Sequence, residues 1–213
     1  MVMEILKKGG GLALFLLLVS ACGELGGSGQ CGGGSENGSC IRIDSIQPTV
    51  LEKNTSSVDI LQVICDPDST ATSTDLEDFE SHAAELSISY LPVPPLTVTD
   101  IPLYVTLNKF SVSYAVGRCQ PAGTNCPPLA PLPLNSLLGE TFSIPAGGTA
   151  KHTLPFFPLD SKIEYAGTAG VNFFAFPHYI ATYKLTGEDT YGNPVSVQGS
   201  AEFEIGNFDN CSA

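Results

Sequence analysis

The amino-acid sequence predicts an all-β protein, an antiparallel β-sandwich of about seven to nine strands. Apolar and polar side chains alternate with a period of two over most of the chain beyond residue 41, as they do in strands with one buried and one wet face. Turns rich in Pro and Gly separate these alternating runs. The polar second face of these strands argues against a parallel sheet covered by helices on both sides, and no long amphipathic helix appears between them.

The strand pattern is clearest near the C-terminus. The odd-numbered positions of 179–185 are Tyr, Ala, Tyr and Leu, and those of 195–205 are mostly apolar too. Residues 187–194 between them contain Gly, Asp, Asn and Pro, which favour a turn. We therefore expect an antiparallel hairpin at this end of the chain.

Shorter runs predict the other strands. The dense apolar run at 58–65 has the composition of a central strand. The apolar positions change from odd to even between Leu107 and Phe110, which predicts a β-bulge near Asn108. Residues 74–83 fit either a short helix that starts at a capping box or an acidic loop. The remaining expected strands cover 41–46, 84–90, 103–116, 141–144 and 150–157.

The N-terminus has the layout of an export signal. Lys7 and Lys8 precede an apolar run at 12–19, which is far shorter than the ~20 residues that span a bilayer. The run ends in the sequence Val-Ser-Ala-Cys at 19–22. This sequence resembles the bacterial lipobox, in which the signal is removed before the Cys and the thiol takes a diacylglycerol. The resemblance implies a signal peptide at 1–21 and a lipid on Cys22.

The same resemblance implies where the protein goes. Two or more acyl chains hold a protein stably on a membrane, since each buried CH₂ contributes about 0.8 kcal/mol. Gly23 rather than Asp follows Cys22, and in bacteria with two membranes this favours sorting to the outer membrane. We therefore expect a membrane-anchored lipoprotein of the cell envelope.

A flexible tether is expected between the lipid and the folded body. Eight of residues 23–40 are Gly. A chain of this length and composition behaves as a coil that spans about 20–25 Å. The domain organisation is then a signal peptide at 1–21, the acylated Cys and its tether at 22–40, and a β-sandwich at 41–213.

The chain is strongly acidic, with a formal net charge of −13 from 9 basic and 22 acidic residues. Removal of 1–21 would take away two Lys and one Glu, which leaves a net charge of −14. Nucleic acid is excluded as a partner, because binding to phosphates needs a basic surface. An acidic body is also repelled by anionic headgroups, so the lipid is the expected membrane contact.

The cysteines predict disulfides, because an even number remains in an exported chain once Cys22 carries lipid. Cys119 and Cys126 bracket a turn-like segment and are the first candidate pair. Local spacing also favours Cys31 with Cys40, and then Cys65 with Cys211, while sequence alone leaves other pairings open. The spacings do not suit a zinc site.

Acidic loops supply the metal candidates, while no catalytic constellation is recognisable. Asp66 and Asp68 follow an expected strand, and Glu188 and Asp189 lie in the C-terminal turn. Ca²⁺ prefers six to eight oxygen ligands, so these residues are calcium candidates, with a solvated acidic loop as the favoured alternative. No Gly-x-Ser-x-Gly elbow occurs beyond residue 41, and an envelope hydrolase that uses scattered carboxylates is the least favoured hypothesis.

A Pro-rich stretch at 127–133 is followed by further Leu residues. Such a stretch favours extended, polyproline-like backbone. It is expected either to form a docking surface or to fold back as a lid over the core. The residues of this candidate surface are Leu129, Leu132, Leu134, Leu137 and Leu138.

The hairpin at the C-terminus and the Pro-Ala-Gly-Gly turn at 145–148 are similar to those of bacterial surface immunoglobulin-like domains. The resemblance implies an immunoglobulin-like sandwich, although the chain has no Trp and so lacks the antibody hallmark. We expect a non-catalytic envelope protein with a structural or protein-binding role, such as an accessory subunit of an envelope or surface assembly. The alternative is a surface module that binds calcium or polysaccharide, and no other cofactor is expected.

Overall fold

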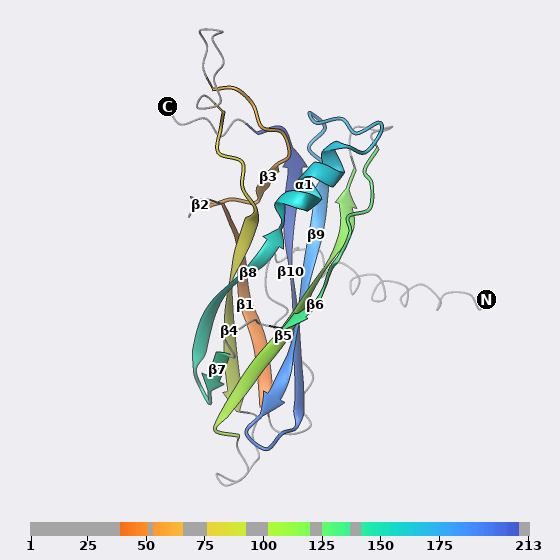
Figure 1. The fold of residues 1–213 in the computed structure, drawn as a ribbon. Coiled ribbons are helices and arrows are strands. Elements are labelled where there is room, and N and C mark those ends of the chain that lie inside the picture. Colours follow the sequence, from red (N-terminus) through yellow and green to blue (C-terminus); the bar gives the residue numbers. More distant parts are fainter. Residues whose placement is uncertain are drawn as a thin grey trace, which may run out of the picture.

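The structure, a computed structural model, describes residues 39–50, 53–65, 76–92, 102–119, 125–136 and 142–208. These residues form ten strands and one helix (Figure 1). The helix, α1 (Leu159–Ala166), follows the eighth strand directly. The strands are β1 (Ser39–Val50), β2 (Lys53–Asn54), β3 (Ser57–Asp59), β4 (His82–Pro92), β5 (Tyr104–Arg118), β6 (Leu132–Ser136), β7 (Phe142–Pro145), β8 (Thr149–Phe157), β9 (His178–Asp189) and β10 (Pro194–Gly206).

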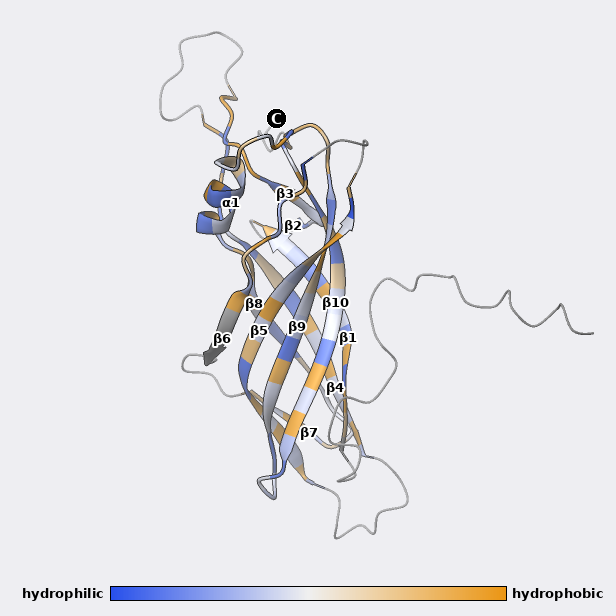
Figure 2. Cartoon of the chain, turned by 90° about the vertical axis from the view of Figure 1, so that its right-hand side faces the viewer, coloured by the Kyte–Doolittle hydropathy of each residue, from blue (hydrophilic) through white to orange (hydrophobic). Residues whose placement is uncertain are grey.

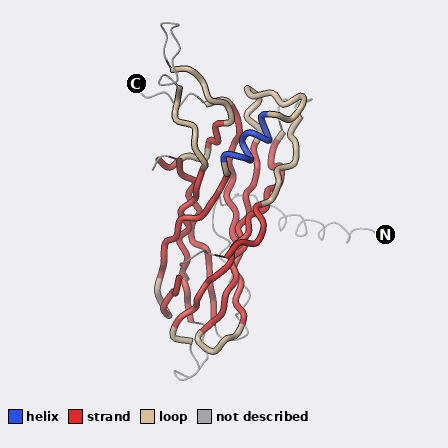
Figure 3. The backbone as a smooth tube through the Cα atoms, viewed as in Figure 1, coloured by secondary structure: helices blue, strands red, loops and turns tan. Residues whose placement is uncertain are grey.

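Two sheets pack together, which confirms the predicted all-β sandwich, while its immunoglobulin-like form stays a prediction. One sheet has the order β2-β1-β4-β8, and the other has the order β3-β10-β9-β5-β6, with β7 also paired to β5. Every pairing between these strands is antiparallel except that of β3 with β10. Figure 3 shows the long strands running along the molecule, with the helix at one end. The described residues hold more strands than expected because the short β2 and β6, of two and five residues, were not predicted.

The predicted C-terminal hairpin is present. β9 and β10 pair over eleven residue pairs across the turn that joins them. Tyr179 and Tyr183 of β9 and Phe203 of β10 are almost completely buried, while their immediate neighbours along each strand face solvent or lie half-buried. Figure 2 shows this alternation as polar and apolar bands along the two strands. The period of two in the sequence therefore reflects one buried and one wet face, as expected.

A bulge interrupts β5 where its apolar pattern changes parity. The pairing of β5 with β9 shifts between Leu107 and Lys109, at the predicted position. Gly187 of β9 lies against this bulge, and a Cβ atom there would be 1.9 Å from the carbonyl oxygen of Thr106. The close approach of the two backbones therefore requires a residue without a side chain.

The prediction of a central strand at 58–65 is wrong. Only β3 is a strand there, and it lies at the edge of the larger sheet, parallel to the last residues of β10. Ile60 continues the contact, since its N–H donates to the carbonyl of Gly206 at 3.1 Å. β10 ends at Gly206, and after Ile60 the chain turns to the loop before β4, where the carbonyl of Val63 accepts a hydrogen bond from the N–H of Glu77 at 3.0 Å.

The helix lies in a different place from the one considered in the sequence. Within the described part of 74–83, Leu76 forms an isolated bridge with Ile64, and the chain is irregular up to β4, so the loop alternative holds. The observed helix, α1, has local start signals in Pro158 at its N-cap and Asp160 in its first turn. Its eight residues bury only Lys162 and Tyr165, which is too few to form an apolar stripe that the sequence would reveal.

Buried tyrosines connect the two sheets through their hydroxyl groups. Tyr183 projects from β9 and donates to the carbonyl of Pro155 in β8 at 2.7 Å. Tyr114 of β5 donates to the neighbouring carbonyl of Phe156. Both hydrogen bonds cross from the larger sheet to the edge strand of the smaller one. Burial raises the pKa of Tyr114 and Tyr183 above the ordinary value, so both hydroxyls stay protonated and can donate.

The sandwich has two distinct ends. One end, which we call the turn end, holds the β9–β10 turn together with the starts of β1 and β5. The other end, which we call the helix end, holds α1 together with the start of β4 and the last residues of β10. β5 alone has 15 residues, so the two ends are on the order of 50 Å apart.

The cross-sheet hydrogen bond of Tyr183 gives a direct test of the packing. Tyr183→Phe keeps the ring but leaves a buried carbonyl without this partner, so we expect the free energy of unfolding to fall by about 1–2 kcal/mol. Urea denaturation followed by circular dichroism measures the change. Tyr104→Phe, at a side chain that is 43% exposed, is the matched control and should stay within about 0.5 kcal/mol of the parent. Equal effects of the two substitutions would contradict the proposed role of the Tyr183 hydroxyl.

Candidate functional site

The helix end gathers segments that are distant in the sequence. α1 begins after Pro158, which makes no side-chain capping bond, and instead the hydroxyl of Ser81 accepts a hydrogen bond from the N–H of Leu159 at 3.0 Å. On its buried side, the ring of Tyr165 packs edge-on against Tyr179 of β9 at a centroid distance of 6.2 Å. The aromatic contact holds the helix against the core, and the hydrogen bond joins it to the loop before β4.

Four ionisable side chains are buried beneath this end, and we call them the ionic cluster: Asp59, Glu77, His82 and Lys162. Each is between 1% and 3% exposed. They come from β3, the loop before β4, the start of β4 and α1. Burial of several charges costs free energy that neighbouring opposite charges offset only in part. A cluster of this kind is therefore the most unusual chemical feature in the described part of the chain.

Asp59 joins β3 to the C-terminal segment. Its Oδ1 atom accepts hydrogen bonds from the N–H of Leu61 at 3.4 Å and from the N–H of Phe208 at 3.1 Å. Its Oδ2 atom is buried without a hydrogen-bond partner. Burial raises the pKa of Asp59 to about 6, against the opposing effect of the two backbone hydrogen bonds. This carboxyl group therefore changes charge just below neutral pH.

His82 is a neutral hydrogen-bond donor. Its Nε2 atom lies 3.2 Å from the carbonyl oxygen of Ser57, so Nε2 carries the proton and Nδ1 is left as a buried acceptor without a partner. Burial lowers the pKa of His82 to about 4, and the positive charge of Lys162 acts in the same direction. The imidazole therefore remains uncharged at neutral pH.

Lys162 supplies the positive charge of the cluster. Its Nζ atom lies 4.4 Å from the centre of the Phe79 ring, in a cation–π contact between α1 and the loop before β4. Burial lowers the pKa of Lys162 to about 8, while the carboxylates of Asp59, Glu77 and Glu80 oppose this shift. The ammonium group is therefore still mainly protonated at pH 7, and its field favours a charged Asp59 and a neutral His82.

Sequence reasoning missed this cluster, although one of its members carried a signal. His82 has the same parity as the buried residues of β4, such as Ala84 and Leu86, so its position already pointed inward. Asp59 lies between Val58 and Ile60 in a run that was expected to be a strand. Its burial depends on the end of β10 and on α1, which the sequence pattern did not reveal.

The Pro-rich segment folds back toward the core, in agreement with the lid interpretation. Leu129 and Leu132 are partly buried and pack against the core, and their role in a docking surface stays a prediction. Pro127 accepts a hydrogen bond from the Tyr179 hydroxyl at 2.9 Å. The side chain of Leu134, and residues Leu137 and Leu138, lie outside the described residues.

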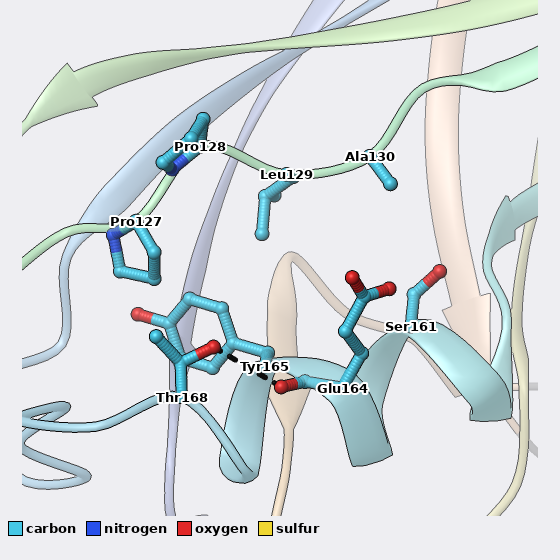
Figure 4. Close-up of a pocket in the computed structure, with 8 residues that line it drawn as sticks. All are labelled: Pro127, Pro128, Leu129, Ala130, Ser161, Glu164, Tyr165 and Thr168. Carbon is cyan, nitrogen blue, oxygen red and sulfur yellow. Dashed lines mark hydrogen bonds between the residues drawn. The ribbon is translucent and has the colours of Figure 1, made fainter.

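A small hollow separates this segment from α1 (Figure 4). Pro127, Pro128 and Leu129 line one side of it, and Tyr165 and the neighbouring residues of α1 line the other. Its volume of about 40 Å³ holds a water molecule or two. It is therefore far too small for a substrate.

The predicted disulfide between Cys119 and Cys126 is present, with 6.1 Å between its Cα atoms. It connects the end of β5 to the start of the Pro-rich segment, so it holds the lid at the helix end. Cys40 and Cys65 are disulfide-bonded as well. The other candidates, Cys31 and Cys211, and the lipid attachment residue Cys22 lie outside the described residues.

Of the four calcium candidates, Glu188 and Asp189 lie in the described part of the chain. The carboxylate of Asp189 accepts hydrogen bonds from the N–H groups of Tyr191 and Asn193 and from the Asn193 side chain, at 2.8–2.9 Å. Asp189 therefore organises the hairpin turn, and the adjacent Glu188 is exposed. Asp66 and Asp68 lie outside the described residues. Among the residues with described structure, no group of three His, Cys, Asp or Glu is arranged to hold a metal ion.

Comparison of the chain with protein-family models, with curated proteins and with solved structures found no match. Within the described ranges, no helix has the length and apolar character to cross a bilayer.

The ionic cluster predicts opposite effects of pH on two variants. The pKa of Asp59 is raised in the folded state, so folding is favoured as pH falls through about 6, and Asp59→Asn removes this gain. The pKa of His82 is lowered in the folded state, so stability is lost as pH falls from 6.5 toward 4, and His82→Gln removes this loss.

Between pH 7 and pH 4 we expect Asp59→Asn to lose on the order of 2 kcal/mol relative to the parent protein, and His82→Gln to gain a similar amount. Urea denaturation at a series of pH values measures both differences. Two variants that change in the same direction would contradict the assigned charge states.

The role of Asp189 predicts a local effect in the hairpin. Asp189→Ala removes three hydrogen bonds to a carboxylate, so we expect the free energy of unfolding to fall by about 2 kcal/mol. Glu188→Ala, one residue earlier and exposed, should change it by less than about 0.5 kcal/mol. Thermal unfolding with and without added calcium measures both effects, and we expect calcium to leave this difference unchanged. A calcium-dependent loss confined to Asp189→Ala would instead make the turn a metal site.

Proposed function

We propose that this chain is a lipid-anchored, non-catalytic protein of the cell envelope with a structural or protein-binding role, as an accessory subunit of an envelope or surface assembly. The sequence Val-Ser-Ala-Cys at 19–22 supports the anchor, because it is similar to the bacterial lipobox. Gly23 after Cys22 supports the outer membrane as the location in a bacterium with two membranes.

The lipobox-like sequence carries the proposal, and the position of the first strand gives the anchored protein an orientation. β1 starts at Ser39, which pairs with Pro92 at the turn end. The Gly-rich segment therefore joins the body at the turn end, opposite α1. If Cys22 holds this segment on a membrane, the turn end lies nearer the lipid and the helix end faces outward, on the order of 50 Å farther away. The helix end is then the surface presented to partners.

Exposed apolar side chains occur at both ends, and the position of the tether indicates which end is free to contact a partner. Ile163, Phe174 and Phe176 lie at the helix end, with Ile163 and Phe174 more than half exposed. Phe176 has a φ angle of 46°, which is unfavourable for a bulky residue, and a Cβ atom on Gly206 would be 2.3 Å from its ring. Leu103 and Tyr191 are exposed at the turn end, next to the attachment of the tether. We therefore assign partner contact to the helix end.

The surroundings of the three histidines support a role without catalysis. His82 is buried, and the ring of His152 stacks on Phe142 at 4.8 Å. His178 lies between Glu202, 2.8 Å from Nδ1, and Arg118, 2.7 Å from Nε2. The arginine can only donate, so the Nε2 atom that would act as a base on a nucleophile already accepts a hydrogen bond.

The anchor gives the first test of the proposal. Cys22→Ser removes the thiol that would take the lipid, so we expect the protein to move from the membrane fraction to the soluble fraction and to lose label from radioactive palmitate. Cys119→Ser is the matched control, because it removes a disulfide cysteine of the body and should keep the label. Palmitate label that persists in Cys22→Ser would rule out the proposed anchor.

A further inference from the structure

A polar groove lies on the outer face of the smaller sheet, toward the helix end. Its volume is about 550 Å³, within the range of roughly 300–1,000 Å³ that is typical of ligand sites. Residues of β1, β2, β4 and β8 line it, and Ser81 borders it just before β4. The groove is separate from the ionic cluster and from the hollow beside α1, since it shares no lining residue with either.

The strand register places the polar side chains of the groove in a row. Gln47 of β1 lies opposite Glu85 of β4, and Glu85 lies opposite Thr153 of β8. Neighbouring strands are about 4.8 Å apart, so this row extends across roughly 10 Å of the sheet. Thr49 lies opposite Ala83, two residues farther along the strands, and its hydroxyl donates to the Ala83 carbonyl at 3.5 Å.

The groove is electrically neutral on a strongly acidic protein. Its charged residues are Lys151 and Glu85, and they pair with each other at 2.7 Å. An anionic ligand would meet an ammonium group that is already paired, on a chain with 22 acidic and 9 basic residues. A cation would meet a single carboxylate, which is also already paired. The charge balance therefore favours an uncharged ligand.

The remaining side chains indicate what kind of uncharged ligand fits. Gln47, Asn54, Thr49, Ser81 and Thr153 offer amides and hydroxyls, which both donate and accept hydrogen bonds. The apolar lining is limited to Val50 and Ala83, so the groove lacks the anchors that an apolar peptide or an acyl chain needs. A ligand that presents many hydroxyl groups matches this lining.

We propose that the groove binds a neutral polysaccharide chain. The sugar hydroxyls hydrogen-bond to Gln47, Thr153 and the ion pair of Lys151 with Glu85, which is open to solvent at its lysine. This binding site goes beyond the proposed envelope role, because it requires neither the lipid anchor nor a protein partner at the helix end. The two surfaces can therefore be tested independently.

Affinity electrophoresis of the full chain purified from cells tests the proposal. Native gels contain one neutral polysaccharide each (dextran, mannan, laminarin, galactan or arabinoxylan), and a further gel contains the anionic polygalacturonate. We expect at least one neutral polysaccharide to retard the protein. The double variant Gln47→Ala/Thr153→Ala should bind it about tenfold more weakly or not at all.

The matched control is Ser111→Ala/Ser113→Ala, on β5 of the other sheet, which should be retarded like the parent protein. Thermal unfolding confirms that both double variants are folded before they are compared. Migration unchanged in all neutral gels, retardation by polygalacturonate alone, or equal retardation of the groove variant and the parent would each overturn the proposal. None of these outcomes depends on whether Cys22 carries a lipid.

Discussion

The hydrogen bonds from Tyr114 and Tyr183 to the backbone of β8 connect the two sheets of this protein. The chain has no Trp, so Tyr and Phe rings fill the space between the sheets and the tyrosine hydroxyls satisfy buried carbonyls there. β8 lies at the free edge of the smaller sheet and leads directly into α1. The position of the helix, and with it the arrangement of the helix end, therefore depends on where these two tyrosines hold β8.

The ionic cluster completes the helix end at an energetic cost. Asp59 fixes the C-terminal segment through the N–H of Phe208, and Lys162 contacts the loop before β4 through the ring of Phe79. Two buried acceptor atoms in the cluster have no hydrogen-bond partner in the described structure, on Asp59 and on His82. Such groups lower the free energy of unfolding, so burial of the apolar core has to offset this loss of stability. The helix end is therefore tied together from several segments but sensitive to pH.

The sequence predicted those features that depend on local pattern. The period of two located the hairpin of β9 and β10, the change of parity located the bulge near Leu107, and close spacing identified Cys119 with Cys126. It failed where distant segments decide the structure. The run at 58–65 is apolar enough for a central strand, but β10 ends beside Asp59, and Ile64 instead forms an isolated bridge with Leu76 of the loop before β4. Lys162 is buried because α1 follows β8 directly and packs on the core. No local sequence pattern predicts this position of the helix.

The structure and the proposed anchor together give the molecule a direction, with the tether at the turn end and the partner surface at the helix end. Photocrosslinking in intact cells tests this claim most directly, with a photoreactive amino acid placed at Ile163 or at Tyr191. These side chains are 59% and 58% exposed and lie at opposite ends of the sandwich. We predict a discrete protein adduct from Ile163, identified as an envelope protein by mass spectrometry, and no such adduct from Tyr191. A protein adduct from Tyr191 alone, or none from Ile163, would contradict the assignment of the helix end as the partner surface.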